Sequence, residues 1–297
     1  MPLATHSHTQ PLIVSLLIPV ILFLISVLYV RGWIRIRRDS RTSFAVRRLA
    51  AFLSGLSVIW IVICSPLAAF DHQFLTAHMV KHLLLMTVAT PLILFGAMRW
   101  SLKVSVPKWF VNGGFLLRSR TRTFIGRFLS NSVLCWFAGS TAVIAWHIPA
   151  LFQLGLLWPT WHTVEDTSFI CAGLLFWLPI LRIWPGHMEQ IHWSMPVYLF
   201  LATLPCDILS AFLTFCGRVI YPGYLSTVQR SGFSPLQDQE CAGALMWTWA
   251  TFAYLIPAVV ITVQMLAPSR VHKDREPLRS SYGSSVAEIS SSEMEVV

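Results

Sequence analysis

Seven long apolar runs constrain what this chain can fold into. A run of about 18 or more apolar residues is long enough to cross a bilayer as a single helix. The runs are Pro11–Val30, Leu49–Phe70, His78–Met98, Asn131–Phe152, Val164–Trp184, Met195–Cys216 and Cys241–Ala267. The sequence therefore predicts an all-α fold, a polytopic membrane protein built as a bundle of seven transmembrane helices.

The composition agrees with a membrane protein. Apolar types make up 55% of the 297 residues and charged types 12%, about half the charged fraction of a typical soluble domain. A mean hydropathy of +0.64 excludes a disordered chain and most soluble enzymes. The net charge of +9 would suggest nucleic acid in a soluble protein, but here the basic residues lie between apolar runs. Membrane lipid is therefore the expected partner of these charges, and nucleic acid is not.

The distribution of Lys and Arg predicts how the bundle is oriented. All but three of the 22 basic residues fall in the loops after the first, third and fifth runs or in the tail after the seventh. Basic loops stay on the cytoplasmic side, so we expect the N-terminus outside and the C-terminus inside. Residues 1–10 then form an outer segment and residues 11–267 the membrane domain. Residues 268–297 form a Ser- and Glu-rich cytoplasmic tail that is predicted to be disordered.

This orientation brings metal-ligating side chains from several helices to the outer end of the bundle. His78 and His82 are four residues apart, so they share one face of the third helix. The fourth and fifth runs add His147 and His162 at the same level. Carboxylates and thioethers lie near these four imidazoles: Glu165, Asp166, Asp238, Met79, Met86 and Met246.

These donor types indicate a transition metal. Imidazole with thioether suits Cu(I), whereas imidazole with carboxylate suits Cu(II) or Zn(II). The four histidines are therefore predicted ligands, and the acids and methionines are predicted to orient them or to replace one of them. Each has an ordinary alternative. A His at a helix end can be a hydrogen-bonded interface residue, Thr163-x-x-Asp166 resembles a capping box, and a buried Met is often a packing residue.

The sequence leaves open the roles of one acid and of one pair of cysteines. Asp207 falls near the middle of the sixth run, and an acid at that depth is either a functional group or a protonated one bonded to another helix. Cys216 and Cys241 both fall near the outer face, where a disulfide is one alternative. The chain has no P-loop, G-x-G-x-x-G, H-E-x-x-H or G-x-S-x-G motif, so we expect neither a nucleotide cofactor nor an enzyme.

Several strings, in their order and spacing, resemble the multi-span CtaG family of cytochrome c oxidase assembly factors. The resemblance covers residues 25–260, nearly the whole membrane part. It rests on LYVRGW, AFLSGLSVIWIVICSPL, AHMVKHLLLMTVATPLIL, AWHIPALFQ, WHTVEDTSFICAGLLFWLPIL, YPGYL and SPLQDQECAGALMW. It implies a multi-pass protein of the cell inner membrane that helps to assemble a terminal oxidase. The partners it implies are cytochrome c oxidase subunits, and whether a periplasmic copper donor is a further partner stays open.

The family motifs fall on the candidate ligands. The family's paired His match His78 and His82, and its W-H-x-P motif matches His147. The start of its fifth span matches His162 and Glu165, and its D-Q motif matches Asp238 and Gln239. The family's fifth span commonly reads H-x-x-E-H, and this chain has Asp166 in place of the second His. Either a carboxylate there makes the metal site harder and less suited to Cu(I), or the position is not a ligand.

The leading prediction is an assembly factor that holds copper transiently at the outer face of the membrane, with zinc as the alternative metal. Three other functions stay open. They are a copper or small-solute transporter, a b-type haem protein that uses His from two spans, and a metal-free scaffold for oxidase assembly in which the His side chains join helices by hydrogen bonds.

Overall fold

The computed structural model describes residues 12–37, 43–97, 131–183, 193–225, 232 and 234–266, and these ranges are helical with short connections. The helices in chain order are α1 (Leu12–Arg37), α2 (Ser43–Cys64), the 3₁₀ segment η1 (Pro66–His72), α3 (Leu75–Leu84), the π-turn η2 (Leu85–Ala89), α4 (Thr90–Ala97), α8 (Ser132–Trp146), α9 (Pro149–Leu157), α10 (Pro159–Ile183), α11 (Ser194–Phe215), the 3₁₀ turn η4 (Pro222–Tyr224) and α13 (Pro235–Leu266). The predicted tail and the predicted outer segment lie outside the described residues.

Six helical stretches of the described chain are long and apolar enough to cross a membrane, or seven if the bent pair α8–α9 counts as one span. This pair corrects the predicted continuous helix over Asn131–Phe152, because its two halves meet at 74°. The break falls at His147 and Ile148, immediately before Pro149. A residue before proline is pushed out of the helical region, and Ile148 accordingly has an extended backbone at φ −65°, ψ 123°.

Three helices that carry candidate ligands begin earlier than predicted. α3 begins at Leu75 instead of His78, α10 at Pro159 instead of Val164, and α13 at Pro235 instead of Cys241. Thr163 therefore lies inside α10, where its hydroxyl donates to the carbonyl of Pro159. The capping-box interpretation of Thr163 and Asp166 is wrong for this reason. The second span is displaced toward the N-terminus, because α2 runs from Ser43 to Cys64 instead of Leu49–Phe70, and η1 follows it from Pro66.

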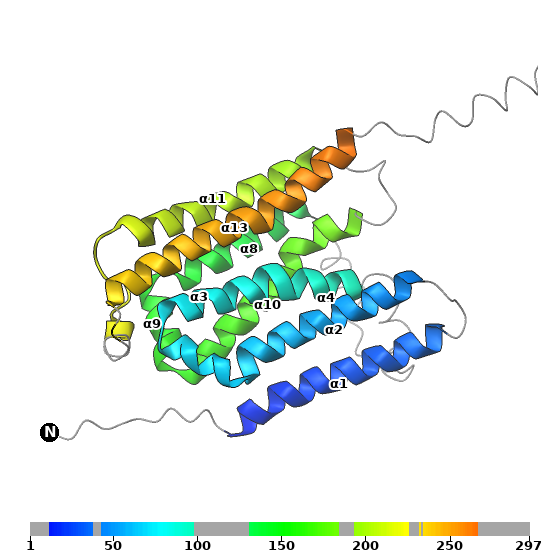
Figure 1. Cartoon of the computed structure of the whole chain (residues 1–297), viewed down its shortest axis with the longest axis horizontal. Helices are drawn as coiled ribbons and strands as arrows, with labels where there is room; N and C mark the ends of the chain where they lie inside the picture. Colours follow the sequence, from blue (N-terminus) through cyan, green and yellow to red (C-terminus); the bar gives the residue numbers. More distant parts are fainter. Residues whose placement is uncertain are drawn as a thin grey trace, which may run out of the picture.

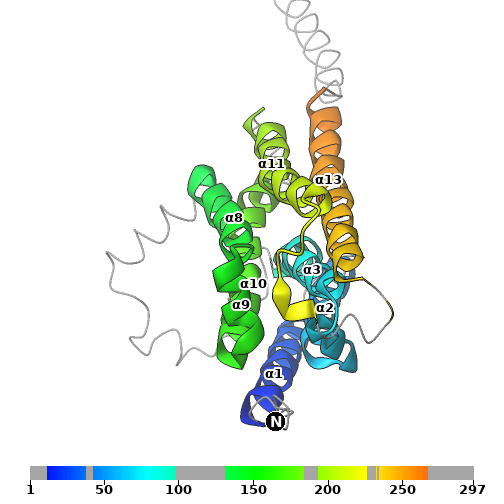
Figure 2. The ribbon, with the colours of Figure 1, turned by 90° about the vertical axis from the view of Figure 1, so that its left-hand side faces the viewer.

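The third span lies at the centre of the bundle. α3 packs against α13, while η2 and α4 pack against α10 and α2, and Figure 2 shows α3 between α10 and α13. On the outside of the bundle, α11 runs along α13, and α1 runs along α2 (Figure 1). Large apolar side chains are exposed on these outer helices, among them Phe23, Ile208, Phe215 and Val263. Such a surface is typical of helices that face lipid.

The π-turn η2 interrupts the third span directly below its two histidines. The carbonyl of Met86 accepts hydrogen bonds from the Thr90 hydroxyl at 2.6 Å and from the Trp177 indole at 2.9 Å. The indole of Trp249 donates to the Thr87 hydroxyl at 2.8 Å. Side chains from α10 and α13 therefore fix this turn, and with it the rotation of α3 about its axis.

Candidate metal centre

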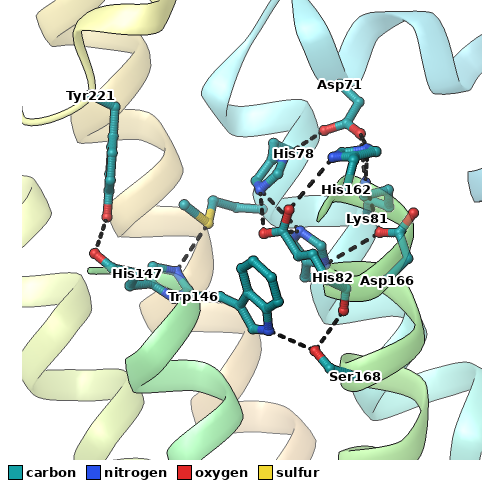
Figure 3. A network of polar contacts seen from close by, with 12 residues as sticks. Asp71, His78, Lys81, His82, Trp146, His147, His162, Asp166, Ser168 and Tyr221 are labelled. Atoms are coloured by element: carbon teal, nitrogen blue, oxygen red, sulfur yellow. Dashed lines mark hydrogen bonds and ion pairs between the residues drawn. The ribbon is translucent and has the colours of Figure 1, made fainter. Parts of the chain in front are cut away.

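A buried polar cluster occupies one end of the bundle, where η1, α3 and α10 meet (Figure 3). Asp71 comes from η1, and α3 supplies residues at i, i+3 and i+4, which share one face of the helix. α10 supplies a second such set. The cluster consists of Asp71, His78, Lys81, His82, His162, Glu165 and Asp166, each less than a tenth exposed.

Three ligating atoms form a small triangle at the centre of this cluster. The Nε2 atoms of His78 and His82 lie 3.0 Å apart, and they lie 3.3 and 3.2 Å from Oε1 of Glu165. Tetrahedral Zn(II) with bonds of about 2.0–2.1 Å holds its ligand atoms about 3.3 Å from one another. The triangle therefore has nearly the dimensions of three ligands around one transition-metal ion, and all three residues are buried.

Aromatic rings and one glycine fix the triangle in place. The ring of Phe169 stacks on His82 with centroids 4.2 Å apart, and Phe152 meets His78 edge-on at 4.9 Å. A Cβ at Gly155 would lie 2.7 Å from Oε2 of Glu165, so a larger residue would displace the carboxylate. The bend between α8 and α9 carries Phe152 and Gly155 to this position.

Asp71 sets the protonation of His78. Its Oδ1 lies 2.6 Å from Nδ1 of His78, so this nitrogen donates its hydrogen, and Nε2 of a neutral ring presents a lone pair to the triangle. A carboxylate that orients a ligating His in this way is common at metal sites. Burial alone would raise the pKa of Asp71, but the charge of Lys81 and hydrogen bonds from His78 and His162 outweigh it and hold the pKa well below its usual range.

Lys81 balances part of the negative charge. Its ammonium lies 2.6 Å from Oδ2 of Asp71 and 2.8 Å from Oδ1 of Asp166. With Glu165, the cluster holds three carboxylates against this one ammonium. Two negative charges are therefore uncompensated while the imidazoles are neutral, and a divalent cation or two further protons would neutralise them.

Several polar atoms at or beside the triangle lack a hydrogen-bond partner, which is uncommon for buried polar groups. Among them are Nδ1 of His82, Oε2 of Glu165 and Nδ1 of His162. The last two atoms lie 3.5 Å apart. The hydrogen bonds of the described residues therefore leave this group incompletely satisfied, as expected of a site that is completed by a ligand.

His147 forms a separate pair with Met79. Its Nδ1 lies 2.7 Å from the carbonyl of Val143, which only accepts, so the ring hydrogen sits on Nδ1. Nε2 of a neutral ring then presents a lone pair to the sulfur of Met79 at 3.2 Å, although a thioether has no hydrogen to donate. An imidazole nitrogen and a thioether sulfur that face one another are donors suited to Cu(I).

The four predicted histidine ligands are therefore divided among three places. His78 and His82 share the triangle with Glu165, and His147 faces Met79. His162 lies beside them, with Nε2 2.9 Å from Oδ2 of Asp71 and 2.8 Å from the ammonium of Lys81. The position at which the sequence departs from the family motif, Asp166, pairs with Lys81.

The D-Q motif joins elements around the site. Both carboxylate oxygens of Asp238 accept hydrogen bonds at the N-terminus of α3, from the amide of Leu75 at 2.7 Å and from the amide and hydroxyl of Thr76. The side chain of Gln239 bonds the backbone of Leu213, Arg218 and Ile220. These two residues thus fix the start of α3 and the chain that follows α11.

The tyrosines after α11 then contact the site. The Tyr221 hydroxyl donates to the carbonyl of His147 and the Tyr224 hydroxyl to the carbonyl of Asp71, both at 2.9 Å. Burial and the charge of Asp71 raise the pKa of Tyr224 well above its usual range, so this hydroxyl keeps its proton and remains a donor.

Other candidates lie in the packed interior or away from the cluster. Met86 and Met246 are buried in the apolar core. Asp207 is half-buried in α11, and its Oδ1 has no hydrogen-bond partner. Cys216 and Cys241 are free thiols, so the disulfide alternative does not hold.

Sequence reasoning missed Asp71 and Lys81. Lys81 is one of the three basic residues outside the cytoplasmic loops and tail, and it lies inside a span between two histidines. A charged side chain inside a span requires a partner, and that rule would have pointed to nearby acids. Asp71 immediately precedes His72, and both lie in the short segment between the second and third predicted runs.

The fold and the cluster define a helical membrane protein with side chains of types that can hold a metal gathered at one end of the bundle. The chain belongs to the family of cytochrome c oxidase caa3 assembly factors, whose model matches residues 27–267. This confirms the resemblance noted in its motifs.

Curated relatives extend the comparison. An uncharacterized protein of Mycobacterium leprae (strain TN) is 23% identical over 252 residues, which are 80% of this chain and 36% of the relative. An uncharacterized protein of Mycobacterium bovis (strain ATCC BAA-935 / AF2122/97) is 24% identical over 261 residues, which are 84% of this chain and 38% of the relative. The chain thus spans little more than a third of the length of these relatives. No solved structure matches it.

Removing the ammonium of Lys81 should destabilise the protein. We expect Lys81→Met to cost about 3–5 kcal/mol of unfolding free energy, because it leaves the carboxylates of Asp71 and Asp166 buried without their cation. The measurement is thermal unfolding of the purified protein in detergent. Adding Asp166→Asn should restore part of the loss.

The matched control is Arg218→Met, which removes an exposed basic residue outside the cluster and should leave the unfolding temperature unchanged. If Lys81→Met unfolds at the wild-type temperature, the ammonium does not stabilise the buried carboxylates.

Proposed function

We propose that this protein takes part in cytochrome c oxidase assembly by holding copper transiently in the buried cluster and passing it to an oxidase subunit. Membership of the assembly-factor family supports the first half of this proposal. The observation that carries the second half is the triangle of His78, His82 and Glu165, whose atoms lie 3.0–3.3 Å apart. Copper is here the cargo of the protein, and no catalytic step is assigned.

The donor types favour copper over zinc. Two imidazoles and a carboxylate suit either Cu(II) or Zn(II), and the uncompensated negative charge of the cluster favours a divalent ion. The pair of His147 and Met79 instead suits Cu(I). Copper is the metal that both donor sets accommodate, whereas zinc suits the triangle alone.

The charge distribution supports a site at the outer face of the cell inner membrane. The cluster lies where α3, α10 and α13 begin and where α8 ends. Lys81, Arg218 and Arg230 are the basic residues that the sequence assigns to this end, and all others fall to the opposite end or the tail. A periplasmic copper donor could then deliver the ion directly to the cluster.

Metal binding tests the central claim. Purified protein loaded with Cu(I) under reducing conditions should retain about one copper per chain. The double variant His78→Ala with His82→Ala should retain none, because His147 and Met79 alone supply only two donor atoms. Glu165→Gln should weaken copper retention, while Glu240→Gln, the same change outside the cluster, should not. A parallel loading with zinc separates the two metals.

The same variants give a cellular readout. In cells that lack the gene, the wild-type chain should restore cytochrome c oxidase activity and the double variant should not. Copper retained by the double variant would overturn the assigned site. A wild-type protein that binds no copper and still restores oxidase activity would favour the metal-free scaffold.

The thioether of Met79 should contribute to Cu(I) affinity. We expect Met79→Leu to weaken Cu(I) binding by roughly tenfold, measured by competition with a chromogenic Cu(I) chelator, because it removes the sulfur that faces His147. Met246→Leu is the matched control, since Met246 is buried in the same apolar cluster. Equal affinities of the two variants would exclude the sulfur as a ligand.

Reporter fusions test the orientation. Alkaline phosphatase folds outside the cytoplasm and green fluorescent protein inside it. We expect phosphatase inserted at Gly232, between α11 and α13, to be active, and phosphatase fused after Val297 to be inactive. Green fluorescent protein fused after Val297 should fluoresce. The opposite pattern would place the cluster on the cytoplasmic side.

A further inference from the structure

A second group of ligating side chains lies next to the triangle. Asp71, His72 and His162 each offer one ligand atom, and these atoms all lie within 4.8 Å of one another. The rings of His72 and His162 have centroids 5.0 Å apart. Asp71 and His162 are buried, but His72 is exposed. This group therefore contains a ligand that solvent reaches, whereas the three residues of the triangle are all buried.

Two cavities meet at this group. One of about 290 Å³ is bordered by Gly155, Pro159 and Gly223, at the end of the bundle that holds the cluster. The other, of about 600 Å³, lies between α1, α2 and α10 and is bordered by Asp71. His72 and His162 line both cavities. An ion that arrives through the smaller cavity thus meets these two imidazoles before it reaches the triangle.

The group shares residues and contacts with the triangle. Asp71 bonds His78 through Oδ1, while its Oδ2 lies 2.9 Å from Nε2 of His162. The other nitrogen of His162 lies 3.5 Å from Glu165, and the rings of His162 and His78 have centroids 6.0 Å apart. Neighbouring ligands this close allow an ion to exchange one ligand at a time.

The charge of Lys81 makes the two groups unequal. Its ammonium lies 2.6 Å from Oδ2 of Asp71 and 2.8 Å from Nε2 of His162, so it opposes a second cation beside these atoms. Glu165, which belongs to the triangle, makes no ion pair with Lys81 among the described contacts. The outer group should therefore bind an ion more weakly than the triangle, as the first station of a transfer path requires.

We propose that Asp71, His72 and His162 form a receiving site, through which a transition-metal ion passes to His78, His82 and Glu165. The donors are two imidazoles and a carboxylate, which suit a borderline ion such as copper or zinc. This proposal rests on the proposed function, because it assigns the path by which the same ion reaches the triangle. His72 is a ligand of this receiving site alone and forms no part of the final site.

The experiment separates rate from affinity. Copper transfer from a coloured Cu(I)–chelator complex to the purified full-length protein is followed by absorbance, and removal by excess chelator is followed in the same way. His72→Ala should slow both loading and removal by about tenfold or more, while the copper bound at equilibrium stays at the wild-type level. A receiving site changes the path in both directions equally, so the equilibrium is unchanged.

Gln73→Ala is the matched control, because it alters the exposed neighbour of His72 without removing an imidazole. Wild-type rates in His72→Ala would overturn the receiving site. Equal slowing by Gln73→Ala, or a lower copper content in His72→Ala, would also overturn it, since His72 would then act through the loop or as a final ligand.

If the wild-type protein binds no copper, the proposed function itself fails. If it binds copper that the double variant His78→Ala with His82→Ala loses, only the receiving site is at stake.

Discussion

The carboxylate of Asp71 joins parts of the structure that helix packing alone would leave separate. One oxygen orients His78 of α3, and the other meets Lys81 of α3 and His162 of α10. The backbone carbonyl of the same residue accepts from Tyr224 in η4. A residue in a short 3₁₀ segment thus connects three elements, and both groups of candidate ligands depend on where its two oxygens point.

Burying this many charges at the end of a membrane bundle is costly, so the arrangement requires a compensating benefit. Within the cluster, each charge faces at least one opposite charge or imidazole. Lys81 reduces the negative charge without neutralising it, which leaves the triangle attractive to a cation. The same ammonium contacts Asp71 and His162 of the outer group, so in the proposed transfer path a single side chain contributes both to stability and to the order in which ligands meet an ion.

Sequence patterns predicted the helical membrane fold and brought the right residue types to one end of the bundle, because apolar length and helical spacing are local properties. Which ligands meet depends on helix rotation and on bends, and these are set by distant contacts. Pro149 can be read from the sequence. The 74° bend beside it, and the close approach of Gly155 to Glu165, cannot. The separation of His147 from His78 depends on the sulfur of Met79 on another helix, a contact that no spacing rule predicts.

The π-turn beneath the histidine pair affects how the site can be lost during evolution. A π-turn holds one residue more than the α-turn it replaces, and one residue corresponds to about 100° of rotation in a helix. Loss of a single residue within Leu85–Ala89 would therefore rotate His78 and His82 away from Glu165 while every ligand remained in the sequence. The direction in which this pair faces is encoded in the length of an apolar segment, so a motif search limited to the ligands would overlook its loss.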